Sequence, residues 1–152
     1  GENYLRYIPN TDHSLADCDA RESIAAWASL VAAGVPRPKF SWSMEDDGSI
    51  RVSTADQPTE VRLWQAVNPE ARDFRLATLG AAWRSRLLGS DGSGVYHGRV
   101  RPPEKGWSAF FVELTYTPAS GKKLKFTTAV RVLPDVLPYI EKLKVYRSGK
   151  SP

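Results

Sequence analysis

Short runs of alternating apolar and polar residues dominate the chain from residue 36 to residue 134. The clearest run is Trp107–Tyr116, in which every second side chain from Phe110 onward is large and apolar. Such alternation gathers the apolar side chains on one face of a β-strand. Long helical periodicity disappears after residue 36. The pattern therefore predicts antiparallel sheets packed face to face, rather than helices or a parallel sheet.

Turn residues divide this stretch into short strands, with a turn signal about every 8–12 residues. Two hairpins are predicted, each around a loop of glycine, serine and aspartate. The first joins 40–44 to 50–52, and the second joins 83–88 to 95–101 across Gly89–Gly94. Two further strands are expected at Glu60–Val67 and Phe74–Leu76.

The run 124–132 is expected to be one continuous strand beside Trp107–Tyr116. Its predicted inward side chains are Leu124, Phe126, Thr128, Val130 and Val132, and its outward ones are Lys125, Thr127 and Arg131. Seven or eight short strands of this kind are typical of one class of domain. Residues 36–134 are therefore predicted to form an immunoglobulin-like or fibronectin-like antiparallel sandwich, and the fold class is mainly β.

Residues 1–35 follow a different pattern. Tyr4–Ile8 is rich enough in β-branched and aromatic residues to predict a short strand, which Pro9 ends. A helix is expected over Ala20–Ala33, ended by Gly34 and Pro36. Asp17 or Asp19 can begin it, and Asp19 with Glu22 has the spacing of a capping box.

The predicted helix carries an apolar stripe of Ile24, Trp27, Ala28 and Val31. A lone strand and one helix cannot form a core, so they need a partner sheet from the rest of the chain or from polypeptide upstream. The second alternative is favoured. The stripe is then expected to be exposed in this chain, unless it packs on the sandwich or on a second chain.

Composition sets limits on the class of protein. The 152 residues are 41% apolar and 25% charged, as in one soluble globular domain. No apolar run reaches the ~20 residues of a transmembrane segment. The net charge is +4, and much of the excess lies in residues 135–152, a basic tail expected to be solvated, with Lys142, Lys144, Arg147 and Lys150. Nucleic-acid-binding motifs are absent, so no nucleic-acid partner is expected.

One histidine stands where a hydrolase would place its catalytic base. His13 lies in a loop after the predicted strand and before the predicted helix, which is the position of the base in an α/β-hydrolase. The nucleophile and the acid precede that base along the chain, and no Gly-x-Ser-x-Gly occurs here. The alternative is a surface-loop histidine beside a helix cap. Ser14 and Cys18 are interpreted as loop residues, because a base usually approaches its nucleophile from another segment.

No metal or cofactor site is expected. Asp12, Asp17 and Asp19 lack the spacing and the glycine of a calcium loop. Two histidines, one of them His97 in a predicted strand, and one cysteine cannot assemble the usual zinc sets. Burial in the core is favoured for the five tryptophans as a set, and only Trp83 and Trp107, near strand starts, are free enough to be exposed. They are the candidates for binding substrate by ring stacking.

Several long runs carry a resemblance to a known family: residues 4–15, 36–42, 63–69, 71–76, 105–114 and 126–132. Together they resemble the C-terminal part of the PhoPQ-activated pathogenicity-related proteins, and the resemblance extends to about Pro138. It implies an α/β-hydrolase whose serine nucleophile and acid lie upstream, followed by an immunoglobulin-like module. His13 matches the family's triad histidine.

The resemblance implies three units: residues 1–35 as the last strand, histidine loop and helix of a hydrolase domain, 36–134 as the sandwich, and 135–152 as the tail. The implied function is serine ester or amide hydrolysis, inactive in this chain without the upstream hydrolase domain as partner. The substrate class is left open among small molecules, peptides and glycans. A secreted or periplasmic, virulence-linked protein is implied. The alternative is a non-catalytic β-sandwich that acts as a binding module.

Overall fold

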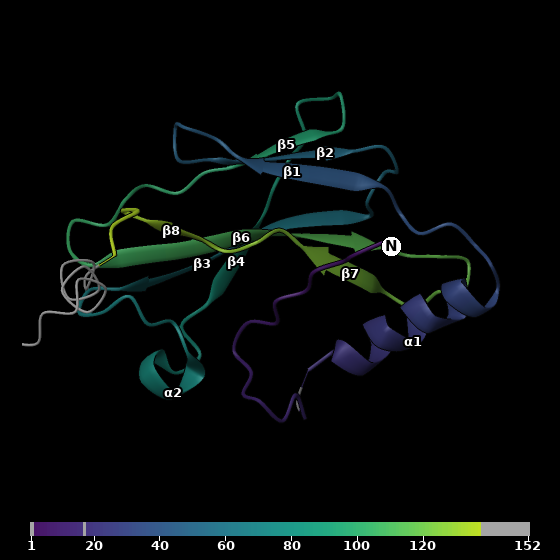
Figure 1. Cartoon of the computed structure of the whole chain (residues 1–152), viewed down its shortest axis with the longest axis horizontal. Helices are drawn as coiled ribbons and strands as arrows, with labels where there is room; N and C mark the ends of the chain where they lie inside the picture. The colour runs from purple at the N-terminus through teal and green to yellow at the C-terminus, as the bar shows by residue number, and fades with distance from the viewer. Residues whose placement is uncertain (1, 17, 138–152) are drawn as a thin grey trace, which may run out of the picture.

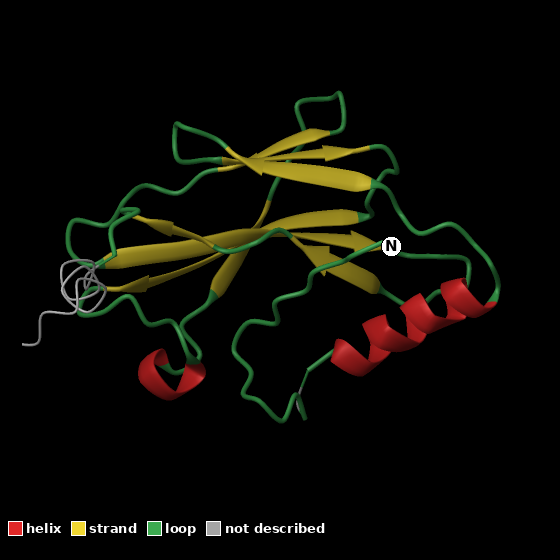
Figure 2. Cartoon of the chain, in the orientation of Figure 1, coloured by secondary structure: helices red, strands yellow, loops and turns green. Residues whose placement is uncertain are grey.

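Two antiparallel β-sheets, stacked as two layers, form most of the protein (Figure 1, Figure 2). The computed structural model describes residues 2–16 and 18–137. The smaller sheet has the order β1-β2-β5, with bounds Phe40–Met44, Ile50–Thr54 and Val95–Gly98. The larger has the order β4-β3-β6-β7, with bounds Arg84–Leu87, Glu60–Asn68, Trp107–Tyr116 and Leu124–Thr127, and β8, Arg131–Leu133, also pairs with β6.

The core lies between the two sheets, as the alternating pattern predicts. Phe110, Val112 and Leu114 of β6 are fully buried there. Ile50 and Val52 of β2 pack into the same cluster from the smaller sheet. Burial of each such side chain contributes about 1.5–3 kcal/mol of transfer free energy. The mainly β fold, with two antiparallel sheets facing one another, is therefore confirmed.

The first hairpin is confirmed in detail. β1 pairs with β2 in the register that places Met44 opposite Ile50. The Asp47 carboxylate accepts hydrogen bonds from the Ser49 N–H at 2.9 Å and the Ser49 hydroxyl at 2.6 Å. Gly48 has a φ of 84°, which a residue with a side chain rarely adopts. The turn residues therefore hold the two strands in register.

The second predicted hairpin is wrong. β4 pairs with β3 in the larger sheet, whereas β5 pairs with β2 in the smaller one. The loop Gly89–Gly94 therefore crosses from one sheet to the other. At its end the Thr54 N–H donates to the Gly94 carbonyl at 3.0 Å, which extends the pairing of the smaller sheet. A glycine-rich loop has the same composition in a hairpin and in a crossover, so local sequence does not separate them.

The predicted single strand over 124–132 is interrupted by a bulge. Three residues separate Thr127 from Arg131, but only two separate their partners on β6, Glu113 and Phe110. The Thr128 hydroxyl accepts from the Val112 N–H at 3.1 Å and so helps to fill the gap in the ladder.

The bulge reverses the predicted faces of β8. Arg131 pairs with the core residue Phe110, and Val132 with Ala109 on the other face. The prediction of Arg131 outward and Val132 inward is therefore wrong. The half-buried Arg131 donates instead to the carbonyls of Glu45, at 2.8 Å, and Ser49, at 3.1 Å, and so ties β8 to the first hairpin.

The short strand predicted at Phe74–Leu76 is also wrong. A one-turn helix, α2, spans Leu76–Leu79 after an extended Arg75. Asp73 directs the chain into it by accepting from the Thr78 hydroxyl at 2.8 Å and from the Arg75 N–H at 3.2 Å. These local hydrogen bonds compete with strand pairing.

Residues 3–8 run along the open edge of β7 (Figure 1). The Thr127 N–H donates to the Leu5 carbonyl at 2.8 Å, and the Tyr7 N–H donates to the Thr127 hydroxyl at 2.9 Å. Because one of the two partners is a side chain, no regular ladder forms, and the predicted strand over Tyr4–Ile8 is wrong. The segment still covers a strand edge that would otherwise be open.

Helix α1, Ala20–Ala32, agrees with the prediction apart from its last residue. Gly34, with a φ of 65°, follows its end. The predicted capping box is wrong, because Asp19 makes no side-chain bond to the helix backbone. Glu22 instead accepts from the Lys123 N–H at 2.9 Å.

The helix packs inward mainly through small residues, together with Leu30, and turns its other large apolar residues outward. Ala20, Ser23 and Ala26 are buried, and the Ser23 hydroxyl accepts from the Lys125 N–H of β7 at 3.2 Å. The outward residues Ile24, Trp27 and Val31 are 64%, 39% and 45% exposed. The expectation of an exposed apolar stripe is confirmed. Sheet contact through small side chains lets the helix approach β7 closely.

Some predictions lie outside the described residues. These are the alternative cap Asp17 and most of the basic tail, with Lys142, Lys144, Arg147 and Lys150. Within residues 2–16 and 18–137, neither helix has the length and apolar character needed to span a bilayer.

Candidate functional site

His13 lies in the loop that joins the extended N-terminal segment to α1, as the sequence predicts. Its side chain belongs to an exposed residue. Among the described residues, no hydrogen bond or ion pair engages its imidazole. The imidazole is thus left available to a group from outside this part of the chain.

The two ends of the loop are fastened together by charge. The Arg6 guanidinium forms an ion pair with the Asp19 carboxylate. Asp19 also accepts a charge-assisted contact from the Lys125 ammonium at 2.8 Å, and this ammonium lies 3.6 Å from the buried Glu113 carboxylate. Partial burial acts to raise the pKa of Asp19, but the hydrogen bond from Lys125 and the charge of Arg6 outweigh it and lower the pKa.

The middle of the loop is fastened to the larger sheet through Asn10. Its side-chain amide donates to the Trp83 carbonyl, and its side-chain oxygen accepts from the Trp83 N–H, both at 3.0 Å. Asn10 has a φ of 56°, a conformation that asparagine tolerates better than most residues. A paired contact of this kind fixes both the position and the direction of the backbone three residues before His13.

The turn around His13 is organised by Asp12. Its carboxylate accepts from the Ser14 N–H at 2.8 Å and from the Ser14 hydroxyl at 2.6 Å. These hydrogen bonds lower the pKa of Asp12, with a smaller contribution from the neighbouring His13. Leu15 follows with a φ of 52°, which is uncommon for a residue with a branched side chain. Such conformations are concentrated at functional sites.

Neither Ser14 nor Cys18, the nucleophilic side chains near His13 in sequence, is hydrogen-bonded to its imidazole. The Ser14 hydroxyl donates to Asp12, and the Cys18 thiol donates to the Leu15 carbonyl at 3.3 Å. The other histidine, His97, lies on β5 of the smaller sheet. In the described ranges there is no cluster of three or more histidine, cysteine or acidic residues able to hold a metal ion.

The two tryptophans singled out as candidates for substrate binding are half-buried. The Trp83 indole donates to the Phe74 carbonyl at 3.2 Å, and its ring centroid lies 5.3 Å from that of Phe111. The Trp107 indole donates to the Val136 carbonyl at 3.3 Å. Each indole is therefore engaged by another segment of the chain, and neither residue is fully exposed. The roles of Trp83 and Trp107 in substrate binding remain predictions.

Two other tryptophans are exposed. Trp27, in the outward stripe of α1, and Trp42, on the edge strand β1, are each 39% exposed. Side chains of an edge strand have a neighbouring strand on one side only, so they are less completely buried. Alternation alone does not reveal which strand lies at an edge.

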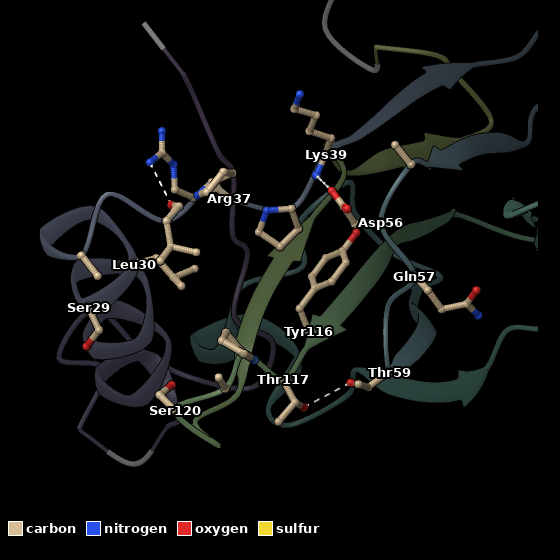
Figure 3. Close-up of a pocket in the computed structure, with 17 residues that line it drawn as sticks. Ser29, Leu30, Arg37, Lys39, Asp56, Gln57, Thr59, Tyr116, Thr117 and Ser120 are labelled. Carbon is tan, nitrogen blue, oxygen red and sulfur yellow. Dashed lines mark hydrogen bonds between the residues drawn. The ribbon is translucent and has the colours of Figure 1, made fainter.

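Sequence reasoning missed a cavity of about 730 Å³ at the junction between α1 and the sandwich (Figure 3). Four separate segments line it: the end of α1, the linker 35–39, the β2–β3 loop and the turn after β6. Tyr116 forms part of the wall and is only 5% exposed. The only sequence signal is the set of prolines at 36, 38 and 118.

Comparisons with known proteins agree with the resemblance. The family model for PhoPQ-activated pathogenicity-related protein matches residues 1–75, which include the His13 loop, α1 and the first three strands. Autocrine proliferation repressor protein A of Dictyostelium discoideum is 32% identical over 163 aligned positions, which cover 91% of this chain. The chain spans 33% of the length of that relative. No solved structure matches the chain. The first 75 residues are thus similar to the PhoPQ-activated pathogenicity-related protein family, and most of the chain is similar to a portion of a longer relative, of which it spans a third.

Proposed function

We propose that this chain is the C-terminal part of a larger serine hydrolase and that His13 is its catalytic base. The observation that carries the proposal is the exposed histidine on a loop fastened at both ends by Arg6 and Asp19 and in the middle by Asn10. A base must hold its imidazole in one place while it meets a nucleophile from another segment. The fastened loop provides that fixed position.

In this proposal the upstream domain supplies the serine, the acid and the oxyanion donors. His13 accepts the serine proton as the hydroxyl attacks an ester or amide carbonyl, and then returns it to the leaving group. The acid orients the imidazole and stabilises its charged form. The chain alone is therefore inactive, because it provides only the base.

The apolar stripe of α1 is proposed as the surface on which the upstream hydrolase domain rests. Ile24, Trp27 and Val31 are exposed together with Leu15 from the His13 loop. Exposed apolar residues gathered in this way mark an interface. The greater length of the Dictyostelium relative supports the existence of such a domain. The same contact would bring the nucleophile toward His13.

The finer assignments also belong to this proposal. The two sheets are proposed to be an immunoglobulin-like module that follows the hydrolase domain, and residues 1–35 the last part of that domain. We propose that the protein is exported to the periplasm or beyond and takes part in virulence, a proposal that rests on the match of residues 1–75 to the family model. The open substrate classes are small esters or amides, peptides and glycans.

The test is turnover of a chromogenic ester by the full-length protein. We expect His13→Ala to lower kcat by about 10⁴-fold or more, the cost of losing a triad base. His97→Ala is the matched control, since His97 is an exposed histidine on a strand of the same module, and it should leave kcat unchanged. Equal activity of His13→Ala and the wild type would refute the proposal.

A further inference from the structure

The cavity at the α1 junction has the size and walls of a small-molecule site. Its volume of about 730 Å³ lies in the range of known ligand pockets. The apolar walls come from Leu30 of α1, Val35 and the prolines at 36, 38 and 118. None of these residues belongs to the His13 loop, so the cavity is separate from the proposed catalytic site.

Tyr116 places an unpaired polar group at this cavity. The residue is 5% exposed, and its buried hydroxyl has no hydrogen-bond partner among residues 2–16 and 18–137. Burial raises the pKa of this phenol, so the hydroxyl keeps its proton and remains a donor at neutral pH. Buried donors without partners are uncommon in folded proteins, and each one calls for an explanation. A ligand with an acceptor group would supply the missing partner.

Asp56 supplies a second polar group beside the first. Its carboxylate accepts from the Lys39 N–H at 2.7 Å, and Figure 3 shows it turned toward the Tyr116 hydroxyl. The Lys39 side chain extends away from the cavity in the same view. Arg37, the remaining charged residue of the wall, is engaged with Glu2 through its Nε at 2.7 Å. Among these residues, Asp56 is therefore the charge that faces the cavity.

We propose that this cavity binds a neutral small molecule with a carboxamide attached to a compact apolar body. The amide carbonyl accepts from Tyr116, the amide N–H donates to Asp56, and the apolar body packs against Leu30, Val35 and the prolines. A carboxylate would be repelled by Asp56. An amine would satisfy Asp56 but offer no acceptor to the tyrosine hydroxyl. The proposal goes beyond the hydrolase function and does not depend on it.

The test is an NMR titration of the 152-residue chain with N-acetyl-leucinamide. Its size predicts a dissociation constant of about 1–10 mM, with shifts at the residues that line the cavity. N-acetyl-leucine is the matched probe, because it differs only in carrying a carboxylate at neutral pH. We expect it to bind about tenfold more weakly or not at all, since its charge is repelled by Asp56.

Two variants separate a ligand role from a structural one. Tyr116→Phe should weaken N-acetyl-leucinamide binding about three- to tenfold, and because no protein partner is lost it should leave Tm unchanged or higher. Tyr96→Phe changes a buried tyrosine outside the cavity and should leave the affinity unchanged. Asp56→Asn should reduce the preference for the amide over the acid.

Three outcomes would each overturn the proposal: no saturable shifts at the cavity, equal binding of the amide and the acid, or unchanged affinity of Tyr116→Phe.

Discussion

At the scale of single residues, the helix-capping rule predicts the position of Asp19 correctly but not the partners of its carboxylate. The sequence correctly predicts that α1 begins after Asp19, because aspartate is common at that position. Its carboxylate, however, bonds to Arg6 and Lys125 instead of the helix backbone. Both cations are distant in sequence, so a capping rule that considers four neighbouring residues does not include them.

Asp19→Asn tests this ion-pair cluster. The pKa of Asp19 is lowered in the folded chain, so its charge stabilises the fold above the unfolded pKa of about 4. That stability is lost as the pH falls through the folded value. Because the carboxylate is a third exposed, we expect Asp19→Asn to cost only about 1 kcal/mol at pH 7.

The measurement is the unfolding free energy of both proteins from pH 7 to pH 3. The difference between them should shrink below about pH 4. Asp46→Asn, in the exposed turn of the first hairpin, is the control and should have little effect at any pH. A difference that stays constant down to pH 3 would show that the Asp19 charge does not stabilise the fold.

At the scale of elements, the sequence predicts where most strands lie but not which strands pair. Alternation is a local property, and it locates β1, β2, β3 and β6 with bounds close to those observed. Pairing depends on packing between distant segments, so β4 and β5 join different sheets. The bulge between β7 and β8 also depends on pairing, because it is defined by the register of the two strands along β6.

The loop around His13 is an element whose attachment could not be read from the sequence. Local residues place His13 between an extended segment and a helix, which the structure confirms. The contact of Asn10 with Trp83 joins residues 73 positions apart. No feature of the sequence near His13 indicates it.

Asn10→Gly tests this attachment. Glycine keeps the positive φ of this position without strain, so the variant removes only the two side-chain hydrogen bonds. We expect the Trp83 amide to exchange with solvent at least about tenfold faster, since its acceptor is lost. Asn3→Gly, in the exposed N-terminal segment, is the control. Unchanged protection of Trp83 in Asn10→Gly would contradict the attachment.

At the scale of the whole molecule, residues 2–35 are packed on the larger sheet but leave one face uncovered. Tyr4 stacks on Phe126 with ring centroids 4.5 Å apart, and Tyr7 contacts Phe111. The segment therefore has a partner sheet within this chain, so the sequence-based preference for a partner sheet from upstream polypeptide is wrong for this packing. One face of α1 packs on the sandwich, whereas its apolar stripe faces outward and remains available to an outside partner.

Ile24→Gln and Ala26→Gln distinguish the two faces of α1. Ile24 is 64% exposed, so its replacement should change the stability of this chain by less than about 0.5 kcal/mol. Ala26 is fully buried, and glutamine there should cost about 2 kcal/mol or more. In the full-length protein, Ile24→Gln should become destabilising if the proposed upstream domain covers the stripe. Chemical denaturation of both lengths of chain measures the effect, and an Ile24→Gln that is neutral in both would contradict a covered stripe.

The proposed catalytic site can be predicted only in part from this sequence, for a physical reason. A triad joins groups from separate segments, and in the proposal this chain provides one of them. The cavity beside α1 is similar, because four segments form it and each looks like an ordinary loop or strand end. Sequence patterns can indicate single elements of such sites, whereas the meeting of distant segments appears only in the folded molecule.

The most direct test of the central claim is labelling of the full-length protein with a fluorophosphonate probe, which reacts with an activated serine. The account predicts that the wild type and His97→Ala are labelled, while His13→Ala is labelled at most at a trace rate because its serine lacks the base. Equal labelling of His13→Ala, or no labelling of the folded wild type, would contradict the account. The second result would favour a non-catalytic binding module.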